Sequence, residues 1–247
     1  MKEFFLLIFI GFFAGIINTL AGGGSLLTLP ALIFLGLPPS IANGTNRIAI
    51  FIQMIVGSAG FKSKGIKTFP FSIYLGVAAL LGSIIGANAA ITISDKVFTK
   101  ILSFVMITVV LLLVLKPKLH QTVFTEKTTG KNLIISCIAF FFFGIYGGFI
   151  NAGLGFILIL FLHYYNQLSL VKANASKAVI ITIYMAGALL VFILNDKVNW
   201  KMGLTMAIGN ALGAWFSSRF SVNKGDKFIK LFLLITITIM AIKLWFF

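Results

Sequence analysis

The sequence contains very few acidic residues, and none of them lies inside an apolar run. The five are found at a chain end or between hydrophobic segments: Glu3, Asp95, Glu126, Asp196 and Asp226. A carboxylate inside the membrane is a common device of proton-relaying pumps. The distribution therefore disfavours a carboxylate-based proton relay.

Cysteine and charge of either sign are also scarce. The single cysteine, Cys137, excludes an internal disulfide and a thiolate metal cluster, and the sequence predicts no metal site and no cofactor. Charged residues make up 10% of the chain and hydrophobic residues 60%. A soluble domain has about 25% charged and about 45–50% apolar residues. The composition therefore predicts an all-α polytopic membrane protein.

The net charge of +15 comes mostly from lysines between the apolar runs. Basic loops beside a membrane suit anionic lipid head groups and set the topology of the chain. We therefore expect membrane lipid as a partner and no nucleic acid.

About 20 apolar residues span the hydrocarbon core as a helix, and on this basis the chain divides into about eight apolar segments. The first and fifth are too long for one crossing, since the first would be roughly 50 Å long as a straight helix. Both contain glycine-rich stretches that we expect to interrupt them. The segments are 4–37, 41–61, 69–92, 97–115, 132–163, 174–194, 200–221 and 228–247.

The two halves, residues 1–125 and 126–247, are predicted to be four-segment repeats within one membrane domain. Four ordered matches at offsets of 127 to 133 residues support the duplication: Asn18 with Asn151, Asn43 with Asn174, Gly82 with Gly209, and Asp95 with Asp226. If every segment crosses the membrane once, the two sides carry 11 and 9 lysine and arginine residues, and this count does not decide the orientation of the chain. If the first and fifth segments each return to the side of the membrane where they start, the two sides carry 13 and 7 lysine and arginine residues and the repeats are inverted. The positive-inside rule favours this arrangement.

The glycine-rich interruptions form the first candidate site. Non-helical backbone inside a bilayer is tolerated only where protein or a watery cavity satisfies it, and paired interruptions point to a transporter's binding site. A helix that restarts near Ser25 would present unpaired N–H groups to an anion. The alternative is that the glycines only permit close packing. The candidate residues are Asn18, Gly22, Gly23, Gly24, Ser25, Asn151, Gly153 and Gly155.

A second candidate constellation follows each interruption. We expect Asn43 and Asn174 to be helix N-caps. Arg47 lies deep in an apolar run, where it needs a cavity or a partner, and Lys177 has nearly the same place in the second half. The two cations would form an anion site, or else extend to the lipid head groups. The candidate residues are Asn43, Thr45, Asn46, Arg47, Asn174, Ser176 and Lys177.

The run Gly22-Gly23-Gly24-Ser25-Leu26-Leu27-Thr28-Leu29-Pro30, followed by Leu37-Pro38-Pro39 and Ala42-Asn43-Gly44-Thr45-Asn46-Arg47, resembles the signature of the sulfite exporter TauE/SafE family. The resemblance covers essentially the whole chain. It implies transport of a small, often sulfur-containing anion, such as sulfite or an organosulfonate, across the bacterial inner membrane. In the second half, Gly153-Leu154-Gly155-Phe156 lacks the Gly-Gly-Gly-Ser run, so we expect the first half to contribute more to the site.

The leading interpretation is a secondary transporter for a small anionic substrate, and not an enzyme. Two other classes stay open at this point. One is a membrane scaffold or accessory subunit, and the other is an intramembrane hydrolase that uses Ser25 with His163 or His120. The sequence does not determine the oligomeric state, and a homo-oligomer is compatible with it.

Overall fold

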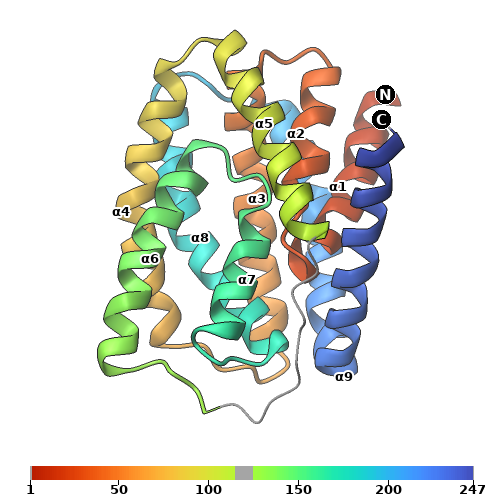
Figure 1. Ribbon diagram of the computed structural model, residues 1–247. Coiled ribbons are helices and arrows are strands. Elements are labelled where there is room, and N and C mark those ends of the chain that lie inside the picture. Colours follow the sequence, from red (N-terminus) through yellow and green to blue (C-terminus); the bar gives the residue numbers. More distant parts are fainter. Residues whose placement is uncertain (1, 115–124, 247) are drawn as a thin grey trace.

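The computed structural model describes residues 2–114 and 125–246, and these residues form helices and no strands (Figure 1). α9 is interrupted at Gly225, whose backbone is not helical. The helices are α1 Lys2–Leu20, α2 Ser25–Phe34, α3 Pro39–Lys62, α4 Phe71–Thr92, α5 Asp95–Val114, α6 Gly130–Phe149, α7 Leu154–Tyr164, α8 Leu170–Leu194 and α9 Trp200–Phe246.

Four of these helices are long and apolar enough to cross a membrane, namely α1, α4, α6 and α8. The short apolar helices α2 and α7 have 10 and 11 residues. At 1.5 Å per residue each is about 15–17 Å long, which is roughly half of a hydrocarbon core of about 30 Å. Neither can cross alone. The two segments expected to be interrupted are each a long helix followed by a short one.

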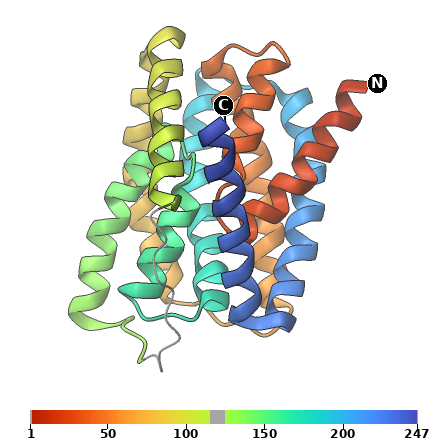
Figure 2. The ribbon, with the colours of Figure 1, turned by 45° about the vertical axis from the view of Figure 1, so that its right-hand side comes forward.

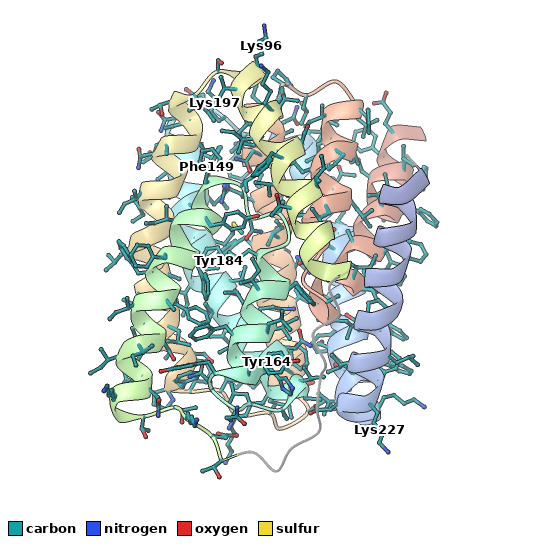
Figure 3. The ribbon with its side chains drawn as sticks, in the orientation of Figure 1. Lys96, Phe149, Tyr164, Tyr184, Lys197 and Lys227 are labelled. Carbon is teal, nitrogen blue, oxygen red and sulfur yellow. The ribbon has the colours of Figure 1, made fainter. Side chains whose placement is uncertain are left out.

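The first interrupted segment forms a hairpin that returns to the end of the molecule where it starts. α1 runs inward from the N-terminus at the upper end of Figure 1, and α2 runs back toward that end. The amide of Ser40, at the start of α3, donates a 2.9 Å hydrogen bond to Oδ1 of Asp95, at the start of α5. Lys96 lies at the same upper end (Figure 3). We call α1 and α2 the first hairpin.

The second interrupted segment forms a hairpin of the opposite direction. α6 runs inward from the lower end of the molecule and α7 returns to it (Figure 1). Lys127, before α6, donates its amide to the carbonyl of Asn166, after α7, at 2.9 Å. Asp226 accepts the amides of Leu170 and Val171, at the start of α8, at 2.9 Å each. We call α6 and α7 the second hairpin, and the two hairpins enter the molecule from opposite ends.

The long helix of each hairpin packs against a helix of the other half so closely that only glycine fits. A Cβ on Gly82 of α4 would lie 2.0 Å from the carbonyl oxygen of Phe141 of α6. A Cβ on Gly209 of α9 would lie 2.0 Å from the carbonyl oxygen of Ile8 of α1. Small residues let helices approach closely where lipid provides no hydrophobic driving force. Two views show α1 beside α9 and both termini at the upper end (Figure 1 and Figure 2).

Replacing Gly82 by alanine is expected to destabilise the protein by about 1–3 kcal/mol, because the new methyl group overlaps backbone that cannot rotate away. The matched control is Gly57→Ala in α3, where the nearest atom to a new Cβ is Cβ of Ala214 at 3.7 Å. Thermal unfolding of the detergent-purified variants measures the difference. Equal melting temperatures for the two variants would contradict the close α4–α6 contact.

Candidate functional site

The tips of the two hairpins touch each other inside the helix bundle. A Cβ on Gly22 would lie 2.1 Å from the carbonyl carbon of Gly155, and a Cβ on Gly155 would lie 2.6 Å from Cα of Gly22. Nδ2 of Asn151 donates to Oγ of Ser25 at 3.4 Å. The structure therefore brings the first residues of α2 and the first residues of α7 into contact, although about 130 residues separate them in the sequence.

The N-termini of α2 and α7 both present backbone N–H groups at this contact. The amides of Gly23, Gly24 and Ser25 donate to no carbonyl in the described part of the chain, and no side-chain oxygen caps α2. α7 begins after Gly153, which has φ 71°, and it too has no side-chain cap. Unpaired N–H groups and the positive end of the helix dipole make a helix N-terminus an anion site. Two such termini meet here.

Lys177 caps the C-terminal end of α1. Its Nζ donates to the carbonyl oxygens of Asn18 and Thr19 at 2.8 and 2.9 Å, and to Oδ1 of Asn174 at 2.7 Å. Nδ2 of Asn174 donates to the carbonyl oxygen of Leu20 at 3.2 Å. An ammonium group has three donors, so all of them are used. Lys177 is fully buried, and it satisfies carbonyls that the end of the helix leaves unpaired.

Arg47 caps the C-terminal end of α6 in the same way. Its guanidinium donates to the carbonyl oxygens of Gly147 and Gly148, and to that of Phe149 at 3.3 Å. Nδ2 of Asn43 donates to the same carbonyl of Phe149 at 2.9 Å. The side chain of Arg47 is 1% exposed, so it does not extend to the lipid head groups. Each half of the chain thus supplies the cation that caps the broken helix of the other half.

The prediction that Asn43 and Asn174 are N-caps is wrong. α3 begins at Pro39 and α8 begins at Leu170, so both asparagines lie inside their helices. Their amide groups instead donate to the C-terminal carbonyls of α6 and α1. An asparagine side chain that faces a neighbouring helix end can satisfy that helix rather than its own.

Among the described residues, no acidic side chain faces the hairpin tips. Asp95 and Asp226 bind helix N-termini at the two ends of the molecule, and Glu126 pairs with Lys172 at 2.6 Å. Each helix end carries about half a unit charge, so a capping cation more than cancels the negative end that it binds. With the positive ends of α2 and α7 added, the region around the tips has a net positive charge.

The other predicted residues have varied surroundings. Gly24 packs on Asn18, since its Cβ would lie 2.5 Å from that of the asparagine. Oγ1 of Thr45 accepts the amide of Asn199 at 2.8 Å, which holds the α8–α9 connection rather than the tips. Among the predicted residues, Asn46 and Ser176 each have a buried side-chain oxygen with no hydrogen-bond partner in the described part of the chain.

Two polar partners of the hairpins are absent from the predicted set. Oε1 of Gln53 accepts from Nδ2 of Asn18 at 3.3 Å and from Nδ2 of Asn210 at 3.0 Å. The hydroxyl of Tyr184 donates to Oδ1 of Asn151 at 2.6 Å. Gln53 and Tyr184 are 131 residues apart, which is one of the offsets between the halves. That spacing is the signal that could have identified them.

The geometry gives no support to a Ser25–His163 pair. The hydroxyl of Ser25 accepts its hydrogen bond from Asn151 at the hairpin tips. His163 is near the other end of α7, where its Nδ1 lies 2.8 Å from the carbonyl oxygen of Leu168. The adjacent Tyr164 lies in the lower part of the molecule (Figure 3). His120 is outside the described residues.

These features define an integral membrane protein of helices with two opposed broken-helix hairpins. The model of the family described as "Sulfite exporter TauE/SafE" matches residues 7–244, and the chain belongs to this family of membrane transporters. The chain is 29% identical over 235 residues to a "Probable membrane transporter protein" of Haemophilus influenzae, covering 95% of this chain and 91% of that protein. It is 31% identical over 238 residues to "Probable membrane transporter protein YfcA" of Escherichia coli K12, covering 96% and 88%. No solved structure gives a significant match.

Proposed function

We propose that this protein is a secondary transporter that carries a small anion, such as sulfite or an organosulfonate, across the bacterial inner membrane. One observation carries the proposal: two helix N-termini with unpaired amides meet inside the bundle, away from every described acidic side chain. A positive, water-poor region of this kind favours an anion over a cation or a neutral molecule. The anion would bind between the two hairpin tips.

The proposal includes two inverted four-segment halves, residues 1–125 and 126–247, that cross the membrane several times. It is supported by the opposite directions of the two hairpins and by the reciprocal caps of Lys177 and Arg47. Under the positive-inside rule, the lower end of the molecule faces the cytoplasm; Lys227 lies at this end (Figure 3), and so does the α3–α4 connection that follows Lys62 and contains Lys67 (Figure 1).

The proposed cycle is a rocking of one half against the other about the contact of the tips. Gly22 and Gly155 touch in the conformation described here, which leaves no room for a ligand between them. An anion would have to separate the tips slightly and would then be reached from one end at a time. The caps on α1 and α6 would keep the broken helices intact during this motion.

The direct test is anion flux in proteoliposomes that contain the purified full chain. Labelled sulfite and a two-carbon sulfonate are the probes, and liposomes without protein give the background. The proposal predicts saturable flux above background for at least one of these anions. If each of these anions crossed only at the background rate, the proposal would be contradicted.

Replacing Ser25 by aspartate is expected to reduce that flux at least about tenfold while the protein stays folded. A carboxylate in the first turn of α2 would take the place of the anion, and it interacts favourably with the helix dipole. The isosteric neutral control is Ser25→Asn. Melting temperatures measured on the same preparations report folding. Wild-type flux in the aspartate variant would show that the anion does not bind at this helix end.

A further inference from the structure

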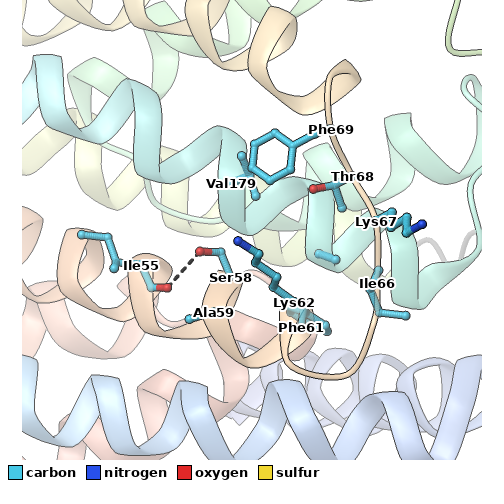
Figure 4. Close-up of a pocket in the computed structure, with 11 residues that line it drawn as sticks. Ile55, Ser58, Ala59, Phe61, Lys62, Ile66, Lys67, Thr68, Phe69 and Val179 are labelled. Carbon is cyan, nitrogen blue, oxygen red and sulfur yellow. Dashed lines mark hydrogen bonds between the residues drawn. The ribbon is translucent and has the colours of Figure 1, made fainter.

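A pocket of about 450 Å³ lies between α3 and α8, away from the hairpin tips. The connection between α3 and α4 covers one side of it (Figure 4). Phe61, in the last turn of α3, and Thr68, in this connection, are buried lining residues, with 1% and 7% of their surfaces exposed. Ligand pockets in proteins have volumes of about 300–1,000 Å³ and are mostly apolar with a few polar groups. The size and the lining both fit that description.

Two lysines without partners line this pocket. The side-chain amines of Lys62 and Lys67 form no ion pair and no hydrogen bond within the described residues, and no acidic residue lines the pocket. In Figure 4 the amine of Lys62 points toward the side of the pocket where Phe69 lies, whereas the amine of Lys67 points away from that of Lys62. By contrast, Lys172 at the start of α8 is paired with Glu126. The positive charge at the pocket is therefore not neutralised by any side chain in residues 2–114 and 125–246.

The pocket also has strongly exposed apolar residues on its walls. Ile55 is 41% exposed and Phe69 is 58% exposed. In a membrane protein, apolar surface of this kind contacts acyl chains. A ligand in the pocket can therefore contact the amine of Lys62 and the bilayer at the same time.

We propose that this pocket binds the head group of an anionic phospholipid. The phosphate would lie at the amine of Lys62, the nearby charge of Lys67 would add to the attraction, and the acyl chains would run along Ile55 and Phe69. Basic pockets between membrane helices on the cytoplasmic side bind such head groups. A free phosphate or sulfonate ester has the same charged group but would leave the apolar walls unused.

The position of the pocket gives the bound lipid a structural role. Ala175 and Val179 of α8 form its far wall, and they lie on either side of Lys177 in the sequence. The lipid would fill the space between α3 and α8, the two helices that carry the capping cations. We therefore expect the bound lipid to raise the melting temperature of the protein.

The test is lipid binding to the detergent-purified full chain, by native mass spectrometry together with thermal unfolding. The probes are dioleoyl phosphatidylglycerol and zwitterionic dioleoyl phosphatidylcholine. The wild type should retain phosphatidylglycerol in preference to phosphatidylcholine, and its melting temperature should be higher with phosphatidylglycerol than with phosphatidylcholine. The double variant Lys62→Gln/Lys67→Gln should bind it at least roughly tenfold more weakly, since each lysine near an anionic lipid contributes about 1 kcal/mol.

The matched control is Lys224→Gln/Lys227→Gln, which removes the same charge at the same end of the molecule but away from the pocket. Equal losses in the two double variants would overturn the proposal, since attraction to the whole basic surface would explain them. Glycerol 3-phosphate added as a competitor separates the two sources of the charged group. Displacement of the lipid at equal concentration would assign the pocket to a free anion and would also overturn the proposal. No step of the test depends on transport.

Discussion

Replacing Lys177 by methionine should lower the melting temperature of the purified protein by about 10 °C or more. Methionine keeps the apolar stem but removes three donors, so the carbonyls of Asn18 and Thr19 and Oδ1 of Asn174 lose their partner. Leaving a buried acceptor without its donor costs about 1–3 kcal/mol, and three acceptors lose their donor here. In a chain of 150–250 residues, each kcal/mol changes the melting temperature by about 2–4 °C.

The control for this experiment is Lys172→Met, on the same helix. Lys172 has a 2.6 Å ion pair with Glu126, but both side chains are partly exposed, at 32% and 40%. Exposed pairs of this kind contribute about 0–1 kcal/mol. The two methionine variants should therefore differ clearly in thermal unfolding followed by tryptophan fluorescence. A similar, small change in both would mean that Lys177 does not cap α1.

Replacing Gly22 by alanine is expected to reduce anion flux at least about tenfold. Gly22 has φ 83°, and its Cβ would lie 2.1 Å from the carbonyl carbon of Gly155. The new Cβ is bonded directly to the backbone at position 22, and the carbonyl carbon of Gly155 is itself a backbone atom, so no side-chain rotation can relieve the overlap. The hairpin tips must separate, or the connection between α1 and α2 must change its conformation. Either change would alter the two helix N-termini at which we propose that the anion binds. The flux of whichever anion the wild type carries is the measurement.

The control separates backbone strain from the steric clash. Gly36 has φ 92°, but nothing lies within 4 Å of its Cβ position. Gly36→Ala therefore has a similar backbone penalty of about 1–2 kcal/mol and no overlap. It should lower the melting temperature slightly and leave the flux close to that of the wild type. If both variants lost flux equally, the effect of Gly22→Ala could not be assigned to the contact between the tips.

Local sequence patterns predicted the helix interruptions because each depends on residues within one short stretch. A run of three glycines and the length of the apolar segment around it are enough to place the break between α1 and α2. The same reasoning placed the break before α7, where Gly153 has φ 71°. Glycine adopts this conformation without a steric penalty, so its position in the chain carries the information.

The roles of the polar residues were harder to predict, and the N-cap assignment of Asn43 and Asn174 shows why. The preference of asparagine for N-caps is real, but a side-chain amide can satisfy any helix end within reach. The start of α3 at Pro39 places Asn43 in the second turn of the helix. Its partner, Phe149, lies 106 residues away in the sequence. No local pattern contains that partner.

The sequence by itself determined the membrane class, the positions of the two interruptions and the presence of a cation in the segment that follows each of them. Hydropathy, glycine content and charge are properties of short stretches, and the bilayer acts on each stretch separately. Only the tertiary structure decided that Lys177 caps α1 and that Arg47 caps α6. Each broken helix leaves carbonyls that some donor must satisfy, but the donor comes from the other half of the chain. Which donor reaches which helix depends on the opposite directions of the two hairpins, and that arrangement exists only in the folded protein.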